Sequence, residues 1–148
     1  LQALIQDCPV PIAVVEETGY KTPAVMYDQE QAQILVTKGL SPEDLFTGIA
    51  RERIHAQYAL GNRNYDRREH HLQIVCASFM LCRKNRVDTS DFDPIATART
   101  LAGMEPREIN KVLTAAKQSV QEISKQMDKV FASVRQDMDT QRGQDHGR

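Results

Sequence analysis

The sequence predicts an α+β domain that is mostly helical, with a small antiparallel sheet or hairpin, three to four helices and a long C-terminal helix. Three observations support this prediction: short β-branched runs precede Ser41, helix caps and stops recur after it, and an apolar repeat closes the chain. With 148 residues, 41% hydrophobic and 26% charged, the chain has the composition of one globular domain. No apolar run approaches the roughly 20 residues that a bilayer helix needs, so we expect no membrane span.

The cysteines indicate the redox state and cellular location of the protein, and the first residue indicates whether the chain is part of a longer one. Cys8, Cys76 and Cys82 are odd in number and show no CxxC spacing, which indicates reduced thiols and a cytoplasmic location. Cys76 and Cys82 lie in an apolar run, so we expect them to be buried. Because the chain begins with Leu1 rather than Met, we expect it to be a piece of a longer protein.

The first part of the chain carries strand signals. Residues 10–17 predict a short strand, and Pro11 favours its start or an edge position. Apolar runs at 24–27 and 32–37 are separated by the polar residues 28–31, which predicts a hairpin with a four-residue loop. We expect this hairpin to form the edge of a small sheet that packs on the helix after it.

That helix has strong end signals. Ser41 can cap it, Pro42 suits its first position, Asp44 completes a capping-box-like Ser-x-x-Asp, and Gly61 provides the stop. Its apolar residues recur at helical spacing, and three of them are expected to face the core: Leu45, Ile49 and Ala56.

Three more helices follow. One is predicted from about Asp66 to Lys84, with apolar contacts from Leu72, Val75, Phe79 and Leu81. A short one begins after Asp93 and ends at Gly103. The last, 106–138, belongs to a single domain that spans 1–138, and residues 139–148 are predicted to form a disordered tail.

The last helix carries a coiled-coil seam. Its apolar positions are spaced 4-3-4-3 and are Ile109, Leu113, Ala116, Val120, Ile123, Met127, Val130 and Val134. The flanking positions lack the charged pairs that specify a zipper partner, which favours packing on its own domain or parent protein over a free zipper. We expect the first half to cover the 66–84 helix, and the half around Met127, Val130 and Val134 to meet a second copy or another protein.

Positive charge is concentrated between residues 51 and 86. There the basic residues outnumber Glu52, Asp66 and Glu69, and they are Arg51, Arg53, Arg63, Arg67, Arg68, Arg83, Lys84 and Arg86. Such a patch can contact phosphate, including nucleic acid, or an acidic protein; the alternative is a solvated helical face. The absence of Trp and the few aromatic residues argue against a base-stacking surface.

The segment Arg51-Glu52-Arg53-Ile54-His55 is one residue away from an HExxH motif. In that motif two histidines one helical turn apart hold Zn²⁺, and the glutamate is the general base for a bound water. Here Glu52 and His55 are present, but Arg51 replaces the first histidine and is permanently cationic, so it cannot be a ligand. The alternative is an ordinary helix that carries Glu and His without a function.

Three further segments carry a family resemblance: Glu69–Cys76, Arg86–Phe92, and the stretch from Tyr27 to Val36. Together with the order of a hairpin, a near-HExxH helix and a second helix, they resemble the metallopeptidase-like domains of ArdC/LtrC-type proteins. Those domains are relatives of the ImmA/IrrE zinc peptidases of mobile genetic elements. The resemblance covers about residues 10–130 and implies a minimal zincin-like fold.

The resemblance also implies roles for residues. Glu52 takes the place of the catalytic base, and metal ligands fall on His55 and on His70, or on Glu69 with a one-residue slip. Because Arg51 stands at the first ligand, we expect it to pair with Glu52 or Glu69 in place of a metal. The resulting hypothesis is a degenerate, non-catalytic interaction or regulatory module without a cofactor.

Two alternatives remain. One is a peptidase that binds zinc through altered ligands. The other is a nucleic-acid-binding helical domain that uses its basic patch: Arg63, Arg67, Arg68, Arg83, Lys84 and Arg86.

Overall fold

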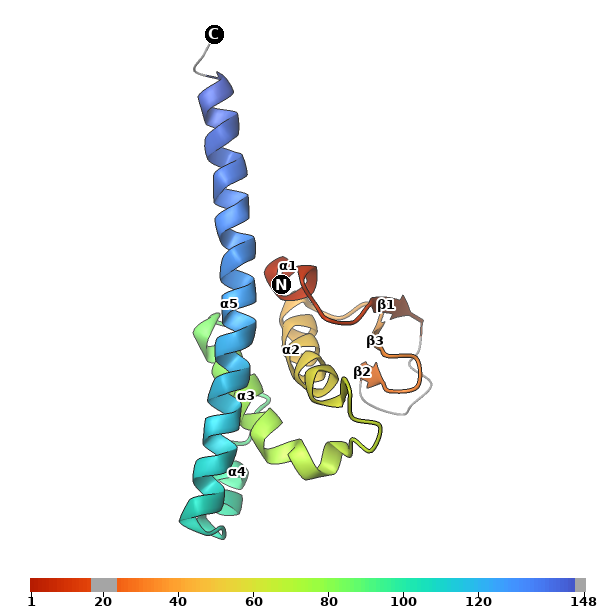
Figure 1. Cartoon of the computed structure of the whole chain (residues 1–148), viewed down its shortest axis with the longest axis vertical. Coiled ribbons are helices and arrows are strands. Elements are labelled where there is room, and N and C mark those ends of the chain that lie inside the picture. Colours follow the sequence, from red (N-terminus) through yellow and green to blue (C-terminus); the bar gives the residue numbers. More distant parts are fainter. Residues whose placement is uncertain (17–23, 146–148) are drawn as a thin grey trace.

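Helices make up most of the computed structural model, which describes residues 1–16 and 24–145 (Figure 1). In chain order the elements are α1 (Gln2–Gln6), β1 (Ile12–Val15), β2 (Val25–Asp28), β3 (Gln33–Thr37), α2 (Pro42–Ala59), the 3-10 turn η1 (Arg67–His70), α3 (His71–Lys84), α4 (Pro94–Ala102) and α5 (Pro106–Asp145). The predicted α+β, mostly helical fold with a long last helix is confirmed. Within the described ranges, no helix is both long and apolar enough to cross a membrane.

The three strands form a mixed sheet in the order β1-β3-β2. β2 and β3 pair antiparallel, which confirms the predicted hairpin. β1 pairs with the other edge of β3 in parallel, so the expectation of a purely antiparallel sheet is corrected. Ile34 N–H donates to the Pro11 carbonyl at 2.8 Å and fixes where β1 enters.

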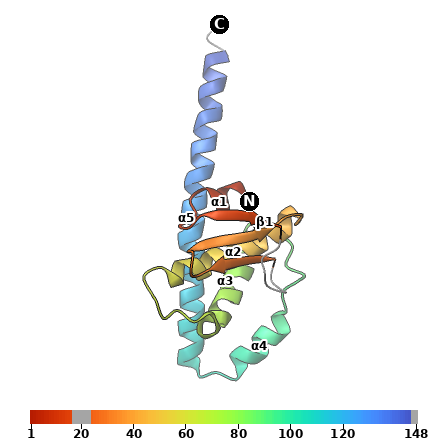
Figure 2. The ribbon, with the colours of Figure 1, turned by 90° about the vertical axis from the view of Figure 1, so that its right-hand side faces the viewer.

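Helix α2 lies between the sheet on one side and the α3–α5 pair on the other (Figures 1 and 2). Ser41 caps it, since its Oγ accepts from Asp44 N–H at 3.1 Å. Ile49 and Ala56 are buried as predicted, whereas Leu45 is only half-buried. Because α2 is covered on several sides, its buried surface extends beyond the predicted apolar stripe.

Arg53 departs most from the sequence-based expectation. It was counted with the basic patch, but its side chain is fully buried where α2 meets α1 and α5. Its guanidinium donates to the carbonyl oxygens of Leu4 and Asp7 and to the side chain of Gln126. These hydrogen bonds satisfy a cation that burial would otherwise destabilise, and they connect three helices.

The predicted 66–84 helix begins as η1 and continues as α3, with Asp66 capping the turn through Arg68 N–H at 3.0 Å. Its buried face differs from the predicted one. Leu72, Val75 and Phe79 are only half-buried, because α3 packs between α2 and α5 through another set of residues: Ile74, Cys76, Ala77, Ser78, Leu81 and Cys82. Helix α4 has the predicted ends, and its cap Asp93 accepts from Ala96 N–H at 3.0 Å.

Helix α5 runs along α3, passes α1 and then leaves the domain (Figure 1). Met127 and Val130, which were expected to meet a partner, are instead buried within the chain. Only the stripe beyond them is open, with Phe131 and Val134 each 45% exposed and Met138 50% exposed. The helix continues to Asp145, so residues 139–145 are helical where a disordered tail was predicted; residues 146–148 lie outside the described residues.

Candidate functional site

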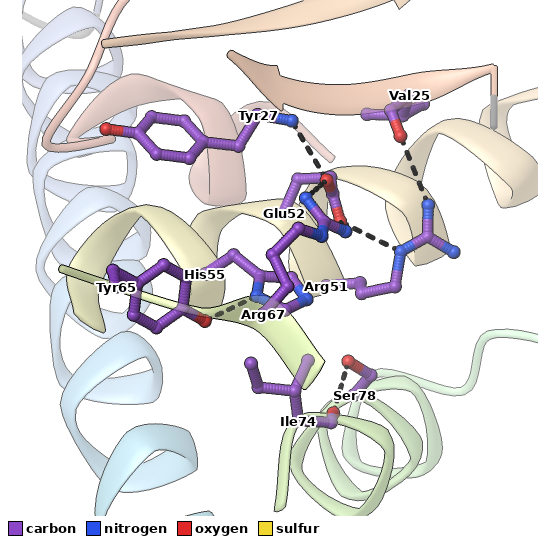
Figure 3. A network of polar contacts seen from close by, with 9 residues as sticks. All are labelled: Val25, Tyr27, Arg51, Glu52, His55, Tyr65, Arg67, Ile74 and Ser78. Carbon is purple, nitrogen blue, oxygen red and sulfur yellow. Dashed lines mark hydrogen bonds and ion pairs between the residues drawn. The ribbon is translucent and has the colours of Figure 1, made fainter. Parts of the chain in front are cut away.

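A buried ion cluster occupies the near-HExxH position of α2. Glu52 is fully buried and faces β2 and η1 (Figure 3). Its Oε1 accepts from Tyr27 N–H at 2.9 Å and from Arg67 Nη1 at 2.7 Å. Its Oε2 accepts from Arg51 Nε and from Arg67 Nη2, both at 3.0 Å. The carboxylate therefore accepts four hydrogen bonds, two of them from a bidentate arginine.

The same cluster binds the open edge of the sheet. Thr37 N–H donates to the Ala24 carbonyl at 2.8 Å, so by antiparallel alternation the backbone polar groups of Val25 and Tyr27 point away from β3. The Val25 carbonyl accepts from Arg51 Nη2 at 3.2 Å, and Tyr27 N–H donates to Glu52. The Arg51–Glu52 pair thus takes hydrogen bonds that an added strand would otherwise form.

The two arginines determine the charge state of Glu52. Burial alone would raise the pKa of this carboxyl, but the Arg67 hydrogen bonds, the charges of Arg51 and Arg67 and the Tyr27 N–H hold the pKa below its ordinary value. Glu52 is therefore an anion at neutral pH, and the trio with Arg51 and Arg67 carries one net positive charge. A general base needs a pKa near the working pH and a free lone pair, and Glu52 has neither.

His55 lies one turn after Glu52 and is also buried. Its Nδ1 is 2.5 Å from the Tyr65 hydroxyl. Burial lowers the pKa of His55 to about 4 and raises the pKa of Tyr65 to about 12, so both side chains are neutral at pH 7. His55 is therefore a hydrogen-bonded core residue.

The remaining predicted ligands do not join His55. His70 stacks on Tyr58 and Tyr65 with ring centroids 5.3 and 5.2 Å apart, and its Nδ1 is 2.9 Å from Gln73 Nε2. Glu69 is exposed. Across residues 1–16 and 24–145, no three His, Cys, Asp or Glu side chains are grouped to hold a metal ion. These residues do not fit the zinc site that the resemblance implies.

The predicted pairing of Arg51 with Glu52 is confirmed, while the role of Arg67 was missed. Arg67 was assigned to the basic patch, yet it makes the closest ion pair with Glu52. No local pattern links two residues 15 positions apart, one on α2 and one on η1. The only available signal was chemical, since a buried carboxylate usually needs more than one partner.

The basic patch is divided in the fold. Arg68 pairs with Asp66 at 3.2 Å and lies with Arg63 before α3. The other members, Arg83, Lys84 and Arg86, lie at the far end of α3, about 20 Å away for a helix of 14 residues. Together with the burial of Arg53 and the pairing of Arg67, this separation leaves two small basic clusters.

A hollow of about 620 Å³ adjoins the ion cluster. It lies between α2, α3, α4 and the start of β2, and Arg51 and His71 are among its lining residues. Its rim also carries three carboxylates, Asp44, Asp91 and Asp93. Because these residues come from separate elements and from the loop before α4, no sequence motif predicted the hollow.

No family model matches the chain, and no curated protein or solved structure is significantly similar to it.

Proposed function

We propose that this chain is a zincin-like domain in which an arginine–carboxylate cluster replaces the catalytic metal, and that it is a non-catalytic interaction module of a mobile-element or phage-type protein. One observation carries the proposal. Glu52, at the general-base position, accepts four hydrogen bonds from Tyr27, Arg51 and Arg67. A metallopeptidase glutamate must instead reach a metal-bound water with a free oxygen.

Electrostatics support the same proposal. Arg51 and Arg67 place two guanidinium groups against one carboxylate, so the site already has an excess of positive charge. A dication would be repelled there by this excess of positive charge. Among the residues that the structure describes, His55 is not grouped with two other His, Cys, Asp or Glu side chains that could complete a metal site.

The proposed interaction role is supported by the position of the ion cluster beside the hollow. The cluster holds the edge of β2 and the turn η1 against α2, and its Arg51 lines the neighbouring hollow. The volume of about 620 Å³ is within the range of about 300–1,000 Å³ that ligand pockets occupy. A wall beside such a hollow that is held by ion pairs suits binding, and the Glu52 carboxylate behind it is already fully hydrogen-bonded.

Metal content and peptidase activity test the proposal together. Purified protein should contain far less than one zinc per chain by mass spectrometry of metals, and adding zinc should produce no cleavage of an unfolded protein substrate. The double variant Arg51→His/Arg67→Gln should gain zinc affinity over Arg51→His alone, because it also removes the positive charge that Arg67 places beside the restored histidine pair. The matched control is Arg51→His/Arg68→Gln, since Arg68 is exposed and does not contact Glu52.

Two experimental results would contradict the proposal. One zinc per chain in the unaltered protein, with zinc-dependent cleavage that Glu52→Gln abolishes, would overturn the proposal. So would an equal gain of zinc affinity in the double variant and in its control.

A further inference from the structure

Helix α4 contributes nothing to the hydrophobic core. It is well capped by Asp93, yet every one of its side chains is at least partly exposed, and Ile95 is 66% exposed. Most helices in folded domains are stabilised by burying one apolar face, and a nine-residue helix is marginal alone. The incomplete packing of α4 therefore needs an explanation.

Cavities lie beside α4 where its packing is incomplete. A cavity of about 210 Å³ separates α4 from α3 and adjoins the larger hollow, with Phe92 and Thr97 lining both. Its walls are almost entirely apolar, and they include Val75, Phe79 and Met80 of α3 and Ala98 and Leu101 of α4. The cavity is smaller than the pockets of drug-sized ligands and is suited to a single apolar side chain.

The larger hollow differs from this apolar cavity because charged side chains line it. Asp44 and Asp91 form no ion pair with any residue that the structure describes, and Asp93 is the cap of α4. Arg51, the arginine of the hollow, already shares its charge with Glu52. Three carboxylates therefore line the larger hollow against the one net positive charge of the trio formed by Arg51, Glu52 and Arg67, and the hollow complements a cation.

We propose that the groove between α3 and α4 binds a peptide segment in which an apolar residue is followed by a basic one. The apolar side chain fills the cavity between Phe79 and Leu101, and the basic side chain reaches Asp91 and Asp44 in the adjoining hollow. This proposal deepens the proposed interaction role by naming its ligand. Filling the cavity also gives α4 the buried apolar contact that it lacks.

Three amidated hexapeptides test the ligand class: Ac-Gly-Ser-Leu-Lys-Ser-Gly-NH₂, a version with Ser for Leu, and a version with Glu for Lys. Binding to the whole chain is followed by ¹H–¹⁵N NMR. The Leu-Lys peptide should shift amide signals of α3 and α4 with a Kd of about 1 mM or tighter. Each altered peptide should bind about tenfold more weakly or not at all, because one loses the apolar anchor and the other meets carboxylates.

Two surface variants locate the site. Ala98→Trp fills the apolar cavity and should abolish binding, whereas Ala102→Trp, on the same helix but outside both cavity linings, should leave it unchanged. Equal binding by all three peptides, or binding that survives Ala98→Trp, would overturn the proposal. The absence of any shift would do the same, while the zinc measurements above would still stand on their own.

Discussion

Replacing Arg67 by Gln should destabilise the fold more than its one-third exposed side chain indicates. The change removes two of the four hydrogen bonds of Glu52, and hydrogen bonds to charged groups contribute about 1.5–3 kcal/mol each. Removing one partner of a fully buried pair costs about 3–5 kcal/mol. Because water reaches Arg67, and Arg51 and Tyr27 still bind Glu52, we expect a loss of about 2–3 kcal/mol.

Urea unfolding followed by circular dichroism measures this loss. The control is Arg68→Gln, because Arg68 is the next residue, is 90% exposed and pairs, among the described residues, with Asp66, so its removal should leave the unfolding midpoint almost unchanged. In a Glu52→Gln background, Arg67→Gln should cost much less than in the unaltered protein, because the buried charge is gone. If Arg67→Gln and Arg68→Gln have the same unfolding midpoint, the cluster does not stabilise the fold and the reasoning is refuted.

The cluster also predicts how stability depends on acid. The pKa of Glu52 is lower in the folded protein than its ordinary value of 4.5, so its contribution is complete above that value. As the pH falls below 4.5 toward the folded pKa, the unfolded chain gains a proton first and the contribution is lost. Arg67→Gln raises the folded pKa, and the unfolding free energy of this variant should fall less steeply with acid.

Three other changes test separate parts of the structure. Gly48→Ala places a Cβ 2.6 Å from a methyl group of Val25, so it should cost about 1–3 kcal/mol in urea unfolding, and Val25→Ala in the same chain should recover part of that cost. His55→Gln should remove a loss of about 3 kcal/mol of unfolding free energy that occurs as the pH falls, because the unfolded His takes a proton near pH 6.5 and the folded one only near 4. An unchanged dependence of the unfolding free energy on pH between 6.5 and 4 would contradict this. Truncation after Val130 should leave the thermal midpoint unchanged. Truncation after Ser124 removes two buried side chains and should cost about 3–5 kcal/mol. Sedimentation of the same two truncated proteins tests whether the exposed stripe of α5 pairs with a second copy.

Local signals explain why most elements could be predicted. Ser41 and Asp93 cap α2 and α4 through their own side chains, within three residues of the groups that they bind. The polar loop of the hairpin likewise separates the two strands that pair with each other. The parallel pairing of β1 could not be predicted, because it depends on which edge of β3 remains free after the hairpin forms.

The buried surfaces of the helices were harder to predict, since periodicity identifies an apolar face but not how many neighbours a helix has. Helix α3 packs against both α2 and α5, and the small residues Ala77 and Ser78 are buried there while the larger Phe79 is only half-buried. Burial of Arg53 could not be predicted either, because its partners are the backbone carbonyls of Leu4 in α1 and Asp7 just after it, and a glutamine of α5. Carbonyl partners leave no trace in side-chain patterns.

The candidate site could be predicted only where the partners are neighbours in sequence. Arg51 and Glu52 are adjacent, and the loss of a ligand histidine at Arg51 pointed to their pairing. One arginine, however, cannot satisfy a carboxylate buried beneath a sheet edge, because each oxygen has two lone pairs and Arg51 reaches only Oε2. Oε1 needs donors of its own, which the fold supplies from the Tyr27 backbone and from Arg67. A chain that keeps Glu52 with arginine at position 51 therefore needs further donors to Oε1, and restoring the histidine without removing Arg67 should leave Glu52 hydrogen-bonded and unavailable as a base.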